Sequence, residues 1–227
     1  MKKMWLTLLP VMALICVFPF SGNAASRYYW QKQCRELMEK NPAKITIYYN
    51  LGKLKYNNSL SSAQIKAMAS NNLNGEITYM GLTLLNLYNK ISVYDSSALE
   101  LGDGYFCTYP TEITMEVGFE NPTVYLANSM DKNSCVYKKT LRHEQQHVDI
   151  SYIFIMSYIE ALKKQLPEIV RNTGPIFSVS KTPDKKLFYI YNEQTMAIFD
   201  EYFEVRQKRS ALMDSAENYE RESKLCR

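Results

Sequence analysis

The chain has 227 residues, 46% of them hydrophobic, and a formal net charge of +4. This length and hydrophobic fraction suit one domain with a buried core, so no second domain is expected. Removal of Lys2 and Lys3 with a leader would lower the net charge to +2, and a balance this weakly basic gives no case for nucleic-acid binding.

The first 24 residues are typical of a secretory signal peptide. Two lysines are followed by an apolar run from Trp5 to Phe20 and then by small residues, which predicts cleavage after Ala24 or Ala25. The run contains two prolines and is short for a membrane span of about 20 apolar residues. We therefore expect an exported protein, periplasmic or secreted, with residues 25–227 as a single domain and no stable membrane span. An uncleaved leader would instead act as an anchor.

Helix and strand signals alternate in the first half of the mature chain. Residues 25–39 predict a short helix that ends at Asn41-Pro42, and the alternation of Ile45, Ile47 and Tyr49 predicts a strand. The remaining expectations before residue 110 are a helix capped by Ser62, a segment at 77–87 that is ambiguous between strand and helix, a strand at 91–94 and turns at 96–104.

Two further strands and two helices are expected after residue 110. Residues 113–117 alternate apolar with polar side chains, and residues 123–127 form a β-rich run after Asn121-Pro122. An amphipathic helix follows around residues 141–162, and a long helix is expected from Asp184 toward Tyr219. The predicted fold class is α+β, with a small, mostly antiparallel sheet followed by these two helices.

The only two histidines of the chain flank a glutamate in the pattern H-E-x-x-H: His143, Glu144 and His147. On a helix, residues four apart share one face, so the two imidazoles can converge on one metal ion with the glutamate beside them. Two surface histidines at this spacing by coincidence are the alternative. A chain so poor in histidine makes the metal site the favoured hypothesis.

The segment from Thr140 to Ile150 resembles the active-site helix of the zincin metallopeptidases, and the resemblance covers little else. It implies that His143 and His147 bind Zn²⁺, that Glu144 is the general base, and that the fold is zincin-like. The longer metzincin signature is absent, since isoleucines replace its glycine and its third histidine. The resemblance is therefore gluzincin-like. Zincins hold substrate on an edge strand, for which residues 124–127 are the candidate, although an ordinary internal strand is the favoured interpretation of this run.

With no third histidine, the third zinc ligand is expected to be a carboxylate, with a tyrosine as the less favoured alternative. Thermolysin-like gluzincins use a glutamate about 20 residues after the second histidine, where this chain has Glu168. However, the apolar period continues to Leu166, and a helix of that length would place its end about 28 Å from the metal.

A carboxylate from the long C-terminal helix is therefore favoured. If that helix packs antiparallel to the motif helix, Glu204 comes level with His147, and we choose Glu201 because its helical neighbours can bury one side of it. Glu204, Asp200 and Glu193 are alternatives, and each can instead be a solvated helix charge. The same segment offers three candidate transition-state donors, between which the sequence does not choose: Tyr191, Tyr202 and Arg206.

Four cysteines remain after leader cleavage, and an even number in an oxidising compartment predicts two disulfides. Of the three possible pairings we favour Cys107–Cys135 with Cys34–Cys226. Free buried thiols are the alternative, and no C-x-x-C pair exists to bind zinc.

Together these patterns predict an exported zinc hydrolase, in the first place a metallopeptidase with a peptide or protein substrate. One alternative is a zinc amidase that acts on cell-wall peptides. Another is a secreted binding protein with a structural or degenerate zinc site, in which some of the 18 tyrosines form the binding surface. The sequence does not predict the oligomeric state.

Overall fold

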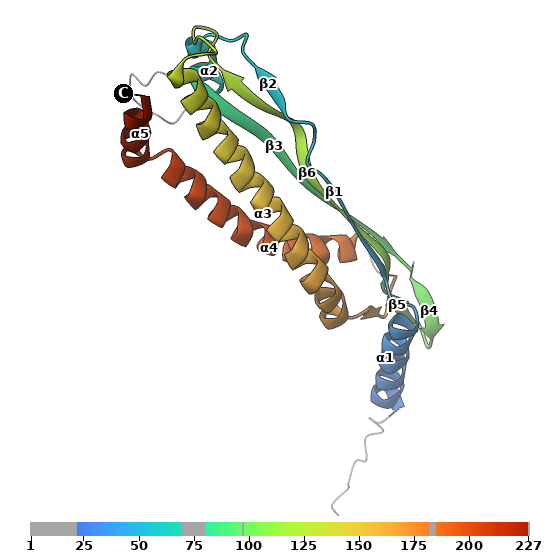
Figure 1. The fold of residues 1–227 in the computed structure, drawn as a ribbon. Helices are drawn as coiled ribbons and strands as arrows, with labels where there is room; N and C mark the ends of the chain where they lie inside the picture. Colours follow the sequence, from blue (N-terminus) through green and yellow to red (C-terminus); the bar gives the residue numbers. More distant parts are fainter. Residues whose placement is uncertain (1–21, 70–79, 97, 182–184, 227) are drawn as a thin grey trace, which may run out of the picture.

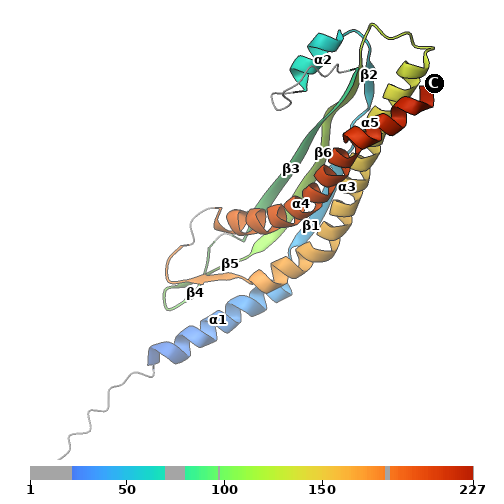
Figure 2. The same cartoon turned by 90° about the vertical axis from the view of Figure 1, so that its left-hand side faces the viewer.

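A computed structural model describes residues 22–69, 80–96, 98–181 and 185–226. These residues form an elongated body in which long strands and long helices run side by side (Figures 1 and 2). The elements are α1 (Gly22–Lys40), β1 (Lys44–Asn50), β2 (Lys55–Asn57), α2 (Ser62–Met68), β3 (Gly81–Asp95), β4 (Leu99–Gly102), β5 (Tyr105–Thr108), β6 (Pro110–Leu126), α3 (Cys135–Thr173), β7 (Ile176–Ser178), α4 (Lys186–Met213), α5 (Ala216–Ser223) and a short 3₁₀ helix, η1 (Lys224–Cys226).

Strand β6 is the centre of the main sheet. On one side it pairs antiparallel with β3 along almost its whole length, and on the other it pairs in parallel, first with β1 and then with β2. A second, antiparallel sheet has the order β4-β5-β7. The expected mixture of a small sheet and long helices is confirmed, although the main sheet contains more parallel pairing than the sequence indicated.

The two strands expected at 113–117 and 123–127 are one continuous strand, β6, which passes through Pro122. A proline has no N–H to donate to a neighbouring strand. Here none is needed, because the pairing with β1 ends at Gly118 and that with β2 begins at Thr123. The pairing with β3 is also irregular at this point, and Asn121 takes a positive φ of 50°. The candidate edge strand at 124–127 is therefore internal, since Val124 and Tyr125 pair with both β3 and β2. β3 forms one edge of the sheet, and β1 and β2 form the other.

Helix α3 covers one face of this sheet. Alternate residues of β6, including Ile113 and Met115, pack against the apolar stripe of α3, including Ile155 and Ile159, and all four side chains are fully buried. Burial of each such side chain stabilises the fold by about 1.5–3 kcal/mol. The helix continues through Pro167 to Thr173, with Val170 still buried, so it is longer than the apolar pattern up to Leu166 predicted.

Helix α4 packs antiparallel to α3, as Figures 1 and 2 show. The register is given by two contacts: the Tyr158 hydroxyl donates to the Thr195 carbonyl, and Arg206 Nε donates to Ser151 Oγ at 2.9 Å. The helix was expected to run on toward Tyr219, but it ends at Met213. Ser215 then caps a separate helix, α5, because its hydroxyl accepts from the backbone N–H of Asn218.

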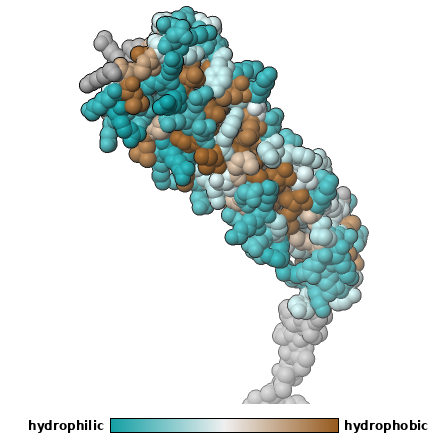
Figure 3. All heavy atoms as spheres, in the orientation of Figure 1, coloured by the Kyte–Doolittle hydropathy of each residue, from teal (hydrophilic) through white to brown (hydrophobic). Residues whose placement is uncertain are grey.

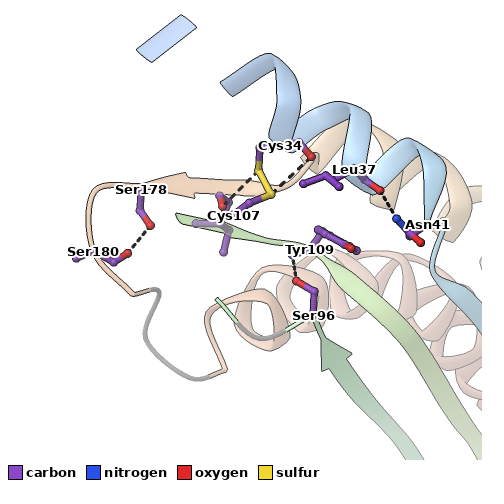
Figure 4. The surroundings of a disulfide bond; sticks show 9 residues. Cys34, Leu37, Asn41, Ser96, Cys107, Tyr109, Ser178 and Ser180 are labelled. Carbon is purple, nitrogen blue, oxygen red and sulfur yellow. Dashed lines mark hydrogen bonds between the residues drawn. A yellow bond between two sulfur atoms is a disulfide. The ribbon is translucent and has the colours of Figure 1, made fainter. Parts of the chain in front are cut away.

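Two disulfides are present, as expected, but both predicted pairings are wrong. Cys34 of α1 bonds to Cys107 of β5, where the two elements meet (Figure 4), and Cys135 at the start of α3 bonds to Cys226. The ends of the chain are therefore not joined to each other. Each is fixed to a different part of the body. Two disulfides fit an exported protein.

Two smaller expectations also changed. Helix α2 is capped by Ser61 rather than Ser62, in a capping box with Gln64. Strand β4 occupies part of the segment expected to be turns, and residues 81–87 are strand.

The expected signal peptide, residues 1–24, falls almost wholly outside the described residues.

No helix in the described part of the chain is long and apolar enough to cross a bilayer. In the view of Figure 1, hydrophobic residues reach the surface as a broken band along the body, between hydrophilic patches (Figure 3).

Candidate metal centre

Both histidines of the motif lie near the start of α3 and point to the same place. Their Nε2 atoms are 3.2 Å apart. His143 is buried and His147 is partly buried. The expectation that residues four apart on this helix bring their imidazoles together is confirmed.

The third member of the group is Asp214, which directly follows α4. Its Oδ1 lies 3.1 Å from Nε2 of both His143 and His147. Zinc bound tetrahedrally at about 2.0–2.1 Å from each ligand requires ligand atoms about 3.3 Å apart. The three observed separations fit this requirement, and two imidazoles with one carboxylate are a usual donor set for catalytic zinc. This group can therefore hold a metal ion.

The charges of the group support one another. Burial by itself would raise the pKa of Asp214, but hydrogen bonds from both histidines outweigh it and hold that pKa well below its usual range. Burial by itself would lower the pKa of His143, but the hydrogen bond to Asp214 and the charges of Glu144 and Glu222 raise it overall. The anionic surroundings that favour a proton on His143 favour a cation at the same place.

Glu144 lies beside the group without being part of it. Its side chain is only 6% exposed, and Oε2 accepts a hydrogen bond of 2.8 Å from the Thr83 hydroxyl of β3. Burial raises the pKa of Glu144, and the Thr83 hydrogen bond and the histidines partly oppose this. Gly81 is needed next to it, because a Cβ there would lie 2.5 Å from Glu144 Oε1.

Helix α5 adds two side chains that the sequence analysis did not single out. The Tyr219 hydroxyl donates to Asp214 Oδ1 at 3.2 Å and lies 3.5 Å from His143 Nε2, and its ring stacks on the imidazole of His143 at 5.1 Å. On the other side of that imidazole, Glu222 Oε2 is 3.3 Å from Nδ1. This buried Nδ1 has no hydrogen bond of good geometry in the described residues, so Glu222 is the nearest carboxylate that can fix its proton.

Several contacts hold α5 against α3. The Cys135–Cys226 disulfide joins the end that follows α5 to the first residue of α3. The buried Asn218 donates to the carbonyl of Met213, across the break that contains Asp214. Asp214, Tyr219 and Glu222 are thereby positioned as a unit over His143.

Glu201, predicted as the third ligand, is not in this group. It is exposed on α4 near Ser157, about three helical turns beyond His147. The three alternatives are not in it either: Glu204 pairs with Lys208, and Asp200 and Glu193 are exposed. The cause is the length of α3. Because that helix ends at Thr173 rather than near Leu166, an antiparallel partner comes level with His147 seven residues later, close to Asp214.

The predicted donors also lie elsewhere. Tyr191 is fully buried in the main core, and Tyr202 and Arg206 line a cavity farther along α3 and α4. Glu168 is exposed near the far end of α3, where it pairs with Arg171. The exclusion of Glu168 by helix length is thus supported.

A signal for the missed residues is present in the sequence. Ser215 is followed by Ala-Glu-Asn, so a good N-cap residue precedes an acidic first turn, as at a helix start. A break at this position would have ended the long helix at Asp214. A chain break between two helices is a common place for a functional side chain.

No protein-family model, curated protein or solved structure matches the chain. The resemblance to zincins therefore rests on the sequence motif alone.

Proposed function

We propose that the chain is an exported zinc-dependent hydrolase, in the first place a metallopeptidase. The observation that carries the proposal is the convergence of His143, His147 and Asp214 at 3.1–3.2 Å with the buried carboxylate of Glu144 beside them. A zinc site that is only structural normally has four protein ligands, whereas three converge here and leave a fourth position for water. Glu144 stays outside the group, and a buried carboxylate that binds no metal costs free energy to desolvate.

The roles of the protein groups follow from their positions. A zinc ion held by the three ligands would supply a Lewis acid that lowers the pKa of a water and polarises the scissile carbonyl. Glu144 accepts the proton of the attacking water and delivers it to the leaving amine. Burial raises the pKa of this carboxyl, which suits a group that must both take and give a proton near neutral pH.

Two residues of α5 assist in this scheme. Tyr219 lies at the edge of the ligand group with a hydroxyl that can turn toward the oxygen that gains charge in the transition state. Glu222, whose Oε2 is 3.3 Å from Nδ1 of His143, is the carboxylate that would hold a proton on Nδ1 and leave Nε2 to bind the metal.

Strand β3 supports a peptide substrate in particular. It begins at Gly81, and its Thr83 hydroxyl donates to Glu144. Among the described residues, only β6 pairs with it. The outer edge of β3 can therefore receive an extended peptide by main-chain hydrogen bonds, the role that the resemblance to zincins assigns to an edge strand. A cell-wall amidase would use the same metal chemistry on a different substrate.

A secreted binding protein is the alternative from another class. Several tyrosines are exposed, but they are distributed over α1, β1, β2, β3, α4 and α5 rather than gathered on one element: Tyr28, Tyr29, Tyr48, Tyr49, Tyr56, Tyr94, Tyr189 and Tyr219. This distribution favours the ordinary role of tyrosine at half-buried surfaces over one aromatic binding face.

Hydrolysis of a peptide library by the zinc-loaded protein tests the proposal. Glu144→Gln should keep its zinc and lose about 10²–10⁴-fold in rate, the usual contribution of a general base. Glu160→Gln, an exposed glutamate on the same helix, should cleave like the wild type. Equal activity of wild type and Glu144→Gln would contradict the proposal, and so would the absence of cleavage of both peptides and cell-wall fragments by zinc-loaded wild type.

A further inference from the structure

A cavity of about 270 Å³ lies between α3 and α4, about one to three helical turns along α3 from His147. On α3 its lining begins at Ile150, three residues after His147 and on the same helical face. On α4 it includes Arg209 and Arg206, five and eight residues before Asp214. At 1.5 Å per residue, these arginines lie about 7.5 and 12 Å along the helix from the third ligand.

Arg206 carries a positive charge that the fold does not neutralise. Its Nε donates to Ser151 Oγ at 2.9 Å, and its guanidinium lies 5.5 Å from the centre of the Phe203 ring. The side chain is partly buried, and burial lowers its pKa. Within the described residues no carboxylate comes within 4.0 Å of it. A cation removed from water without an anion costs free energy, so an anion that enters the cavity would gain an unusually strong interaction.

The other lining residues indicate which kind of anion the cavity can accept. Arg209 is exposed and adds a second positive charge at the end nearer the metal, whereas Glu201 is the one acidic residue among those that line the cavity. Ile153 and Val205 expose 54% and 48% of their surface, which is high for large apolar side chains in a helix pair. The cavity thus offers apolar walls and an excess of positive charge.

We propose that this cavity binds a carboxylate carried on an apolar or aromatic group, with Arg206 and Arg209 as its partners. The consequence for the substrate rests on the proposed hydrolase function. At about 3.3 Å per residue of extended chain, the two arginines are two to four residues from the scissile bond. The carboxylate is therefore a substrate terminus or an acidic side chain within that distance of the bond.

A pair of isosteric probes tests the binding site itself. Binding of 3-phenylpropanoate and of 3-phenylpropanamide to the zinc-loaded protein is measured by NMR titration, and repeated on the His143→Ala/His147→Ala variant, in which a carboxylate cannot ligate zinc. The acid should bind about tenfold or more tightly than the amide in both proteins, because only the acid makes charge-assisted hydrogen bonds to the arginines. Equal binding of the two probes would overturn the proposal. So would loss of the preference for the acid in the His143→Ala/His147→Ala variant.

Variants locate the site. Arg206→Gln and Arg209→Gln should each weaken binding of the acid about tenfold, and Glu201→Gln should strengthen it, because a repulsive charge is removed. Arg171→Gln, at the far end of α3, is the matched control and should bind as the wild type does. Arg209 is exposed, so its variant keeps the test valid even if Arg206→Gln destabilises the helix pair. Unchanged affinity in Arg209→Gln and in a folded Arg206→Gln would contradict the assignment.

Peptide pairs then separate the two sources of the carboxylate. One pair differs in a C-terminal carboxylate or amide, and the other in an internal glutamate or glutamine. For each pair, the ratio of kcat/KM between the charged and the uncharged peptide is measured. The pair with the larger ratio in wild type, and whose ratio falls in Arg209→Gln, identifies the source of the carboxylate. If no peptide is cleaved at all, the metallopeptidase proposal fails, while the probe titration still decides whether the cavity binds a carboxylate.

Discussion

Asp214 Oδ1 lies 3.1 Å from Nε2 of His147, although 67 residues separate the two in the chain. The contact forms because α4 ends one residue before Asp214, at the place where it has come level with the start of α3. The candidate metal centre is thus formed by side chains of α3 and of the short break that follows α4. Residues that fix this break should influence metal binding from a distance.

The Cys135–Cys226 disulfide should contribute to metal affinity indirectly, by holding α5 in place. The Cys135→Ser/Cys226→Ser variant releases α5, which carries Tyr219 and Glu222, and zinc affinity should fall about 10–100-fold, the cost typical of losing outer contacts of a metal site. Competition with a fluorescent chelator measures this.

The Cys34→Ser/Cys107→Ser variant is the control, since it opens a loop of comparable size at the other end of the body. Both variants should lose about 2–5 kcal/mol in free energy of unfolding. Only the first should lose zinc affinity, and equal affinities would contradict the role given to α5.

Tyr219→Phe should lower kcat about 10²–10³-fold if the hydroxyl stabilises the transition-state oxygen. The phenylalanine ring can still stack on His143, so the zinc content should not change. Steady-state kinetics with elemental analysis of the same sample measures both. Unaltered kcat would remove Tyr219 from the mechanism.

Thr83→Val should shift the pH dependence of hydrolysis. Burial raises the pKa of Glu144 and the Thr83 hydroxyl opposes this, so loss of the hydroxyl should raise the pKa further. Glu144 acts as a base only when ionised, and the acid limb of the kcat/KM profile should therefore move to higher pH. Thr83→Ser keeps the donor and should retain the wild-type profile. An acid limb that stays in place in the valine variant would show that the hydrogen bond does not control the base.

Gly81→Ala should separate metal binding from catalysis. The added Cβ would lie 2.5 Å from Glu144 Oε1 and 2.8 Å from Thr140 Cγ2, so the carboxylate must move. A displacement of about 1 Å of a catalytic group can cost about 10²-fold in rate. Full zinc content with a large loss of kcat is the expected result. Wild-type kinetics would mean that Glu144 has no fixed position.

Much of the fold could be predicted from local patterns, and the errors have physical causes. The H-E-x-x-H helix and strand β1 are apparent from periodicity alone. Pro122 normally ends a strand, and only the change of partner from β1 to β2 allows β6 to pass through it. No local pattern reports such an event, because it depends on strands far away in the sequence.

The candidate site also contains residues that local spacing predicts and residues that it does not. His143, Glu144 and His147 follow from spacing within one helix. The third ligand depends on where two helices end. An error of seven residues at the end of α3 shifts the position level with His147 from near Asp214 to Glu204, and Glu201 is predicted as a neighbour of that position. The disulfide pairing failed for a related reason, since it requires the position of α1 and of the C-terminal segment relative to the body.

The zinc content of Asp214→Ala, compared with wild type and Glu201→Ala, tests the central claim most directly. Elemental analysis of the purified, zinc-loaded proteins should give about one zinc per chain for wild type and Glu201→Ala. Asp214→Ala should lose most of its zinc on dialysis while it remains folded by circular dichroism. Full zinc retention in Asp214→Ala, or loss of zinc from Glu201→Ala instead, would contradict the metal centre described above.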